Sequence, residues 1–196
     1  MEKEIRRQQR WEAILSSLKR FDYLSRSQLQ ILHGLGSARN ASRVLKDMSD
    51  YVSYFLDGEA VYYLTKAGRE AVGATKVRKK SLQARHFVMR NQMYIALGCP
   101  SSWINEAKLS VAGQATIIAD ALFKHGEQFN VVEVDNTQKM SENRSKITKY
   151  RKLLELGVFK EPPVFYWITK TEYRRKQLQK MCDGLNAMIY TVNDLK

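Results

Sequence analysis

Three carboxylates in two neighbouring segments are the residues of this chain best suited to chemistry. Asp120 lies in the segment ATIIADALF, and Glu133 and Asp135 lie near the end of FNVVEVD. Both segments have the composition of strands, and residues two apart in a strand point to the same face. Carboxylates gathered at one place suit Mg²⁺ or Mn²⁺, and such an ion polarises a phosphodiester and helps to generate hydroxide. We therefore predict a candidate metal site made of Asp120, Glu133 and Asp135.

A lysine that activates water or stabilises charge normally completes such a site. The next segment, SENRSKITKYRKLLELG, has helical apolar spacing, with Ser141 as a cap and Gly157 as a stop. Lys146 and Lys149 lie in this expected helix and Lys139 lies before it. We take Lys146 as the fourth catalytic candidate.

The composition favours a nucleic acid partner. The chain has 196 residues, 44% of them hydrophobic, with a formal net charge of +13 and a pI near 9.8. This length allows one ordinary domain or two small ones. An excess of basic side chains suits a polyanion, because these side chains displace counterions from phosphates. We therefore expect binding to double-stranded DNA.

The sequence also indicates where the protein acts. The charged N-terminal segment lacks the apolar stretch of a signal peptide, and no apolar run approaches the ~20 residues of a membrane span. Cys99 and Cys182 stand in unrelated contexts, as expected of two free thiols in a reducing compartment. We expect a cytoplasmic protein with no membrane partner.

The first third of the chain predicts a winged helix-turn-helix domain over residues 1–75. Three helical segments precede two β-rich runs around Asp57-Gly58, which predict a hairpin turn with positive φ at both central residues, and a short helix follows. In such a domain the third helix, Ser37 to Asp50, enters the major groove and the hairpin lies on the backbone. The polar face of that helix carries the expected DNA-binding residues, Arg39, Asn40, Ser42, Arg43 and Lys46.

A basic segment leads into a second expected domain, residues 76–196. Lys79 and Lys80 lie in this segment and are further DNA-binding candidates. A helix near 81–97, three strands, a helix, a strand and a closing helix give the order αβββαβα. The predicted fold class is therefore α+β or α/β.

The second domain resembles the PD-(D/E)xK nuclease fold, which implies a restriction-endonuclease-like domain. Asp120 matches the first acid of that family, Glu133 the second, and Lys146 with Tyr150 the helix motif. The pattern departs at Asp135, where lysine is usual. The resemblance leaves three alternatives open: a live site in which the lysine has migrated to the helix, a degenerate site, or an unrelated α/β fold.

Nearly the whole chain resembles the replication-relaxation proteins of plasmids and mobile elements in Gram-positive bacteria. The resemblance rests on the motif Leu64-Thr65-Lys66-Ala67-Gly68 after the expected wing, on VVEVDNTQKMSENRSKITKYRKLL, and on the order of the elements. It implies a DNA-binding protein that acts in replication or DNA relaxation. The departure from the nuclease pattern at Asp135 leads us to expect that the nuclease-like domain is degenerate. A homodimer or replication proteins are further expected partners. The alternatives are a Mg²⁺-dependent endonuclease that nicks DNA and a winged-helix transcriptional regulator.

Overall fold

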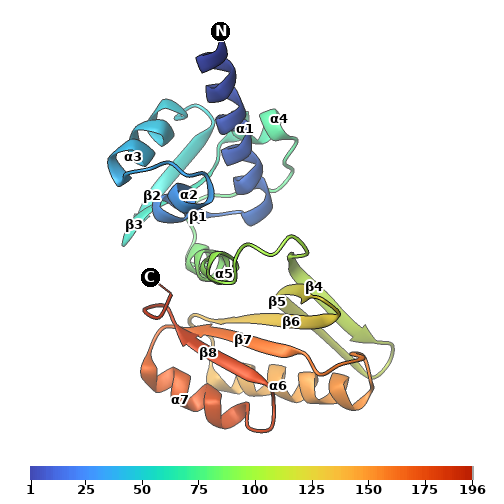
Figure 1. Cartoon of the computed structure of the whole chain (residues 1–196). Helices are drawn as coiled ribbons and strands as arrows, with labels where there is room; N and C mark the ends of the chain where they lie inside the picture. Colours follow the sequence, from blue (N-terminus) through green and yellow to red (C-terminus); the bar gives the residue numbers. More distant parts are fainter. Residues whose placement is uncertain (196) are drawn as a thin grey trace. The chain divides into compact units, whose positions relative to one another are not determined.

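The chain forms two compact units, Met1–Asn91 and Gln92–Lys196, in a computed structural model that describes residues 1–195. The described residues form seven helices and two sheets, which gives a mixed α+β architecture (Figure 1). The units divide inside one helix rather than between residues 75 and 76, where the sequence placed the boundary.

Residues 76–91 belong to the first unit because they bond to it. The Nε of Arg78 donates to Asp22 at 2.9 Å, and the hydroxyl of Tyr23 donates to the carbonyl of Lys79 at 2.6 Å. The side-chain amide of Asn91 donates to the carbonyl of Tyr23 at 2.7 Å. The basic segment is therefore fixed to the unit and is not a free linker.

The first unit consists of helices around a three-stranded antiparallel sheet in the order β1-β3-β2. Two-residue strand β1 was not expected from the sequence. The elements are α1 Glu2–Phe21, β1 Leu24–Ser25, α2 Arg26–Leu32, α3 Ala38–Asp47, β2 Val52–Asp57, β3 Glu59–Leu64, α4 Lys66–Val72 and the start of α5 Ala84–Ala96.

Side-chain caps set where the short helices of this unit begin. The hydroxyl of Ser37 accepts from the N–H of Asn40 at the start of α3, and Thr65 caps α4 in the same way. Ser25 and Gln28 form a reciprocal capping box at α2. These caps satisfy N–H groups that have no partner within a helix.

The β2–β3 hairpin is tighter than the sequence predicted. Asp57 pairs with Glu59, and Gly58 between them has φ 77°. Asp57 itself remains in extended strand geometry, so only one residue of the turn has positive φ. The carboxylate of Asp57 accepts from Arg85 at 2.8 Å, which ties the end of the hairpin to α5.

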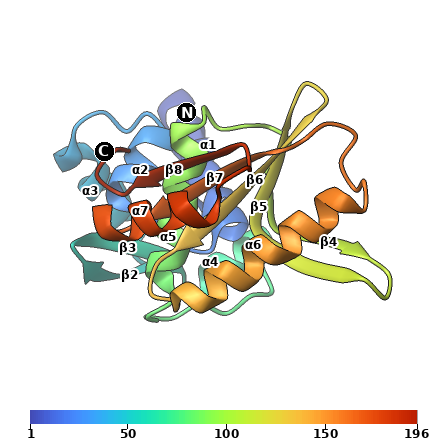
Figure 2. The ribbon, with the colours of Figure 1, turned by 90° about the horizontal axis from the view of Figure 1, so that it is seen from below.

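The second unit is a five-stranded mixed sheet in the order β4-β5-β6-β7-β8, with antiparallel pairing in β4-β5-β6 and parallel pairing in β6-β7-β8. Helices α6 and α7, which make the parallel crossovers, cover the same face of the sheet (Figures 1 and 2). Strand β8 extends the αβββαβα order that the sequence predicted. The elements are β4 Ile104–Val111, β5 Ala115–His125, β6 Gln128–Asp135, α6 Met140–Glu155, β7 Val164–Thr169, α7 Glu172–Met181 and β8 Ala187–Thr191.

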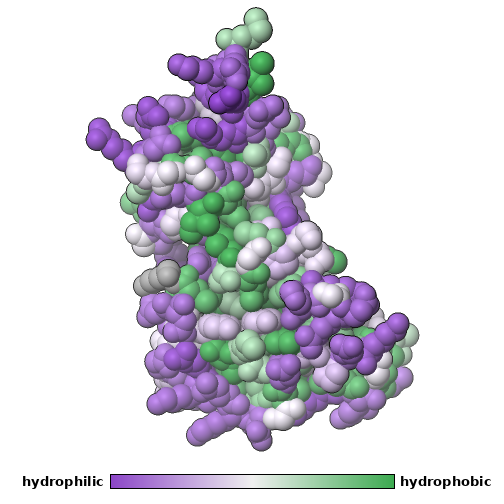
Figure 3. All heavy atoms as spheres, in the orientation of Figure 1, coloured by the Kyte–Doolittle hydropathy of each residue, from purple (hydrophilic) through white to green (hydrophobic). Residues whose placement is uncertain are grey.

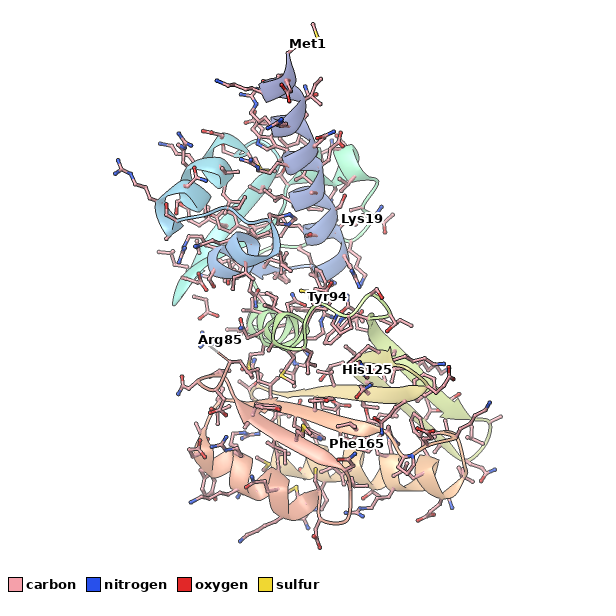
Figure 4. All side chains as sticks on the ribbon, viewed as in Figure 1. Met1, Lys19, Arg85, Tyr94, His125 and Phe165 are labelled. Carbon is pink, nitrogen blue, oxygen red and sulfur yellow. The ribbon has the colours of Figure 1, made fainter. Side chains whose placement is uncertain are left out.

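The core of this unit lies between the sheet and its two helices. Tyr150 of α6 packs edge-on against Phe165 of β7 with ring centroids 4.9 Å apart, and Trp167 is buried beside them. Phe165 is labelled on the sheet in Figure 4. Because α6 is pressed onto this face, the polar residues of its inner side are brought directly over β6.

No helix in the described part of the chain combines the length and apolar composition needed to cross a membrane. Cys99 is exposed and Cys182 is buried, and neither forms a disulfide within residues 1–195, as the sequence predicted.

Candidate functional site

Lys146 joins two of the predicted acids in the second unit. Its ammonium group donates to Oε2 of Glu133 and lies 3.6 Å from Oδ2 of Asp120. The hydroxyl of Tyr150 donates to the other oxygen of Glu133. Asp120 comes from β5, Glu133 from β6, and Lys146 and Tyr150 from α6, so the fold assembles this group from three elements.

Helical spacing explains how α6 contributes to this site. Asn143, Lys146 and Tyr150 are three and four residues apart, which places them on one stripe of a helix. All three bond to acids of β6. The stripe interrupts the apolar face of α6 with polar groups that have partners on the sheet.

Asp120 lies where β5 separates from β6. Their ladder ends at the pair Ala121 and Val132, and two residues farther along β6 the N–H of Val134 donates to Oδ2 of Asp120 at 2.7 Å. On the other side of β5, the pairing with β4 skips the position of Asp120: its two neighbours pair with Asn105 and Ala107. Glu106 lies between these two residues of β4 and has φ 53°. The carboxylate of Asp120 therefore replaces a backbone acceptor at a distortion of the sheet.

The environment of Glu133 favours its protonated form. Burial raises its pKa to about 8, and the negative charge of Asp120 adds to the rise, whereas Lys146 and Tyr150 oppose it. Burial lowers the pKa of Lys146, but the charges of Glu133 and Asp120 outweigh this effect and raise it. The lysine therefore stays charged, and one proton on the acids makes the group electrically neutral.

Asp135 belongs to a separate group although it shares a face with Glu133. Arg174 of α7 donates to both of its oxygens, through Nε at 2.6 Å and Nη2 at 2.5 Å. Thr169 and Asn143 donate to the same carboxylate at 2.7 and 2.8 Å. Burial would raise the pKa of Asp135, but these hydrogen bonds outweigh burial and lower it. Asp135 is thus an ionised carboxylate with every oxygen engaged.

These contacts do not fit the three-carboxylate magnesium or manganese site expected from the sequence. The structure brings together Asp120, Glu133 and Lys146, and it leaves Asp135 with Arg174. Among residues 1–195, no three His, Cys, Asp or Glu side chains are grouped as metal ligands. An ammonium group lies between the two remaining acids, in the place where a shared cation would be needed.

Sequence reasoning missed Arg174, Thr169 and Asn143. Arg174 lies far along the chain from Asp135, so no local spacing connects them. Asn143 could have been predicted from helix spacing, because it precedes Lys146 by three residues and Tyr150 by seven and so lies on the same helix face.

The DNA-binding candidates of the first unit lie on the outer face of α3. Ala41, Val44 and Leu45 are buried on its inner face. Arg39, Ser42, Arg43 and Lys46 are exposed, and Lys79 and Lys80 are exposed in the segment before α5.

Asn40 differs from the other candidates on α3. Its amide donates to the carbonyl of Leu35 at 2.8 Å, and its oxygen accepts from Arg43 at 2.8 Å. The side chain thus fastens the loop before α3 and positions the Arg43 guanidinium.

Comparisons with known proteins identify a family for most of the chain. A family model described as replication-relaxation matches residues 15–164. No curated protein matches. A solved structure, protein VC1899 from Vibrio cholerae, matches with 10% identity and a TM-score of 0.44. The match covers 81% of this chain but only 40% of the length of the Vibrio protein.

Proposed function

The chain belongs to the replication-relaxation family, and on this premise we propose that it is a DNA-binding protein that acts in the replication or relaxation of a plasmid or other mobile element. The proposal assigns double-stranded DNA to the first unit, as a winged helix. It assigns to the second unit a nuclease-like domain that has lost its metal site.

The row of exposed cations on α3 is the observation that carries this proposal. Arg39, Arg43 and Lys46 project from a helix whose other face is buried. A helix with this division presents donors for phosphates and base edges when it lies in the major groove. The tight β2–β3 hairpin is the element that a winged helix lays on the flanking backbone.

Fluorescence anisotropy with a labelled duplex tests the assignment. We expect Arg39→Ala/Lys46→Ala to bind at least about tenfold more weakly than the wild type, because two phosphate or base contacts are lost. Both residues are exposed, so the fold should persist. The control Lys108→Ala/Lys160→Ala removes two exposed charges from the second unit and should bind nearly as well as the wild type. Equal affinity of both variants would overturn the role of α3.

A metal-dependent endonuclease is the second candidate, because Asp120, Glu133 and Lys146 do meet at one place. Incubation of supercoiled plasmid with the protein and MgCl₂ or MnCl₂ tests this candidate. We expect the plasmid to stay intact. Nicking by the wild type that is lost in Lys146→Met would establish the endonuclease and overturn the degenerate site.

A further inference from the structure

The first unit has a basic groove between the N-terminal half of α1 and α3. Its volume is about 380 Å³. Trp11, Val44 and Asp47 line it together with five cations, Lys3, Arg6, Arg7, Arg10 and Arg43. Four of these cations belong to α1, whose N-terminal end is marked by the Met1 label in Figure 4, and mostly hydrophilic residues cover this end in the space-filling view (Figure 3).

The positions of the cations on α1 form a line. Lys3, Arg7 and Arg10 are separated by four and three residues, so they lie on one helix face. A helix rises about 1.5 Å per residue, so this row is roughly 10 Å long. One strand of B-DNA carries a charge about every 3.4 Å along its axis, so a row of this length is long enough to meet more than one phosphate.

The acids around the groove leave most of this charge available. Glu2 pairs with Arg6 and Glu4 with Arg7, but these side chains are 49–79% exposed. Exposed pairs contribute little and exchange readily for a phosphate. No ion pair within the described residues involves Lys3 or Arg10. Asp47 is the remaining acid in the lining.

Arg43 connects the groove to the expected DNA surface. It lines the groove, and it also belongs to the exposed face of α3. Asn40 accepts from its Nη2 and so holds it at the border between the two. The groove is thus continuous with the helix that we assign to the major groove.

We propose that this groove binds the phosphate backbone of the DNA duplex on which α3 lies. The inference rests on the proposed function and extends it, because α1 lies outside the helix and hairpin through which a winged helix is expected to bind. Lys3, Arg7 and Arg10 supply the charge, and Trp11 supports Arg7, whose guanidinium lies 5.3 Å from the ring centroid.

The salt dependence of duplex binding tests the groove. The variant Lys3→Gln/Arg10→Gln should bind about tenfold more weakly near 0.1 M KCl. Each lost phosphate contact should reduce the slope of log K against log[KCl] by about 1, so the slope should fall by about 2. The charge-retaining variant Lys3→Arg/Arg10→Lys should keep the wild-type slope, and Lys108→Gln/Lys160→Gln should keep it as well.

The outcomes separate this inference from the proposed function. If Lys3→Gln/Arg10→Gln keeps the wild-type slope while Arg39→Ala/Lys46→Ala binds weakly, the groove is overturned as a DNA surface and the role of α3 stands. That result would favour an acidic protein as the partner that binds in the groove. Failure of the wild type to bind duplex DNA even at low salt would overturn both.

Discussion

Replacing Glu133 by glutamine tests whether this buried carboxyl group holds a proton at neutral pH. A protonated carboxyl accepts from Lys146 through Oε2, and its Oε1 forms a hydrogen bond with the hydroxyl of Tyr150 in which the protonated carboxyl oxygen is the donor. The glutamine amide has the same shape: its oxygen can accept from Lys146, and its NH2 group can donate to the hydroxyl of Tyr150. The substitution therefore fixes the protonated form without creating a cavity.

The pKa of Glu133 sets the sign and size of the effect. Folding raises it from 4.5 to about 8. The stability that this proton contributes is complete below pH 4.5 and is lost as the pH rises to about 8, because the unfolded chain releases the proton first. The rise corresponds to about 5 kcal/mol, or about 1.4 kcal/mol for each pH unit. Glutamine cannot ionise, so the variant should lose none of it.

Urea unfolding at several pH values measures this difference. Trp103 and Trp167 report on the second unit if the first-unit tryptophan is removed by Trp11→Phe in all proteins compared. We expect equal stabilities near pH 4.5 and a variant that is more stable by up to about 5 kcal/mol at pH 8. Glu127→Gln, which alters an exposed acid, should follow the wild type.

One result would refute the reasoning about Glu133. If the carboxylate is ionised against Lys146 at neutral pH, glutamine removes one half of a buried ion pair. The variant would then be less stable than the wild type at pH 7, and the advantage at pH 8 would be absent.

Three further substitutions test individual contacts by thermal or urea unfolding. Arg174→Ala should lower the free energy of unfolding by about 3–5 kcal/mol at pH 7, because it leaves the buried Asp135 carboxylate without its cation. Folding lowers the pKa of Asp135. The stability that this carboxylate contributes is therefore present above pH 3.8 and is lost as the pH falls through its folded pKa. Gly68→Ala should destabilise the first unit by about 1–3 kcal/mol or more, since its Cβ would lie 2.0 Å from the carbonyl oxygen of Tyr51, and an unchanged melting temperature would contradict the packing. Thr65→Ala removes the cap of α4 and should cost about 1 kcal/mol, whereas Thr65→Ser should cost less.

The elements that the sequence predicted are those with a strong local signal. Apolar spacing located α3 and α6, and Asp57-Gly58 located the hairpin, because periodicity and turn chemistry are local properties. The two-residue β1 is too short to show a period. Strand β8 shows only weak alternation after the turn at Asp183-Gly184, and its place is set by pairing with β7. The division inside α5 depends on bonds such as that from Asn91 to Tyr23, which sequence spacing does not encode.

The candidate site was predictable in part for the same reason. Alternation placed Glu133 and Asp135 on one face, and helix spacing brought Lys146 toward them. Alternation does not reveal which side chains cover that face. Arg174 arrives from α7, a distant segment, and its bidentate bond removes Asp135 from any shared site.

The charge of the Lys146 group bears on how this fold can be used. With both acids ionised, the group would carry one net negative charge in a buried place, which is costly. One proton on Glu133 and the ammonium of Lys146 make it neutral, so it neither attracts a divalent cation strongly nor repels the phosphates of DNA. A lysine is also tethered, so this charge cannot leave as an ion can. A polar cluster arranged in this way links β5, β6 and α6 through hydrogen bonds of their own side chains.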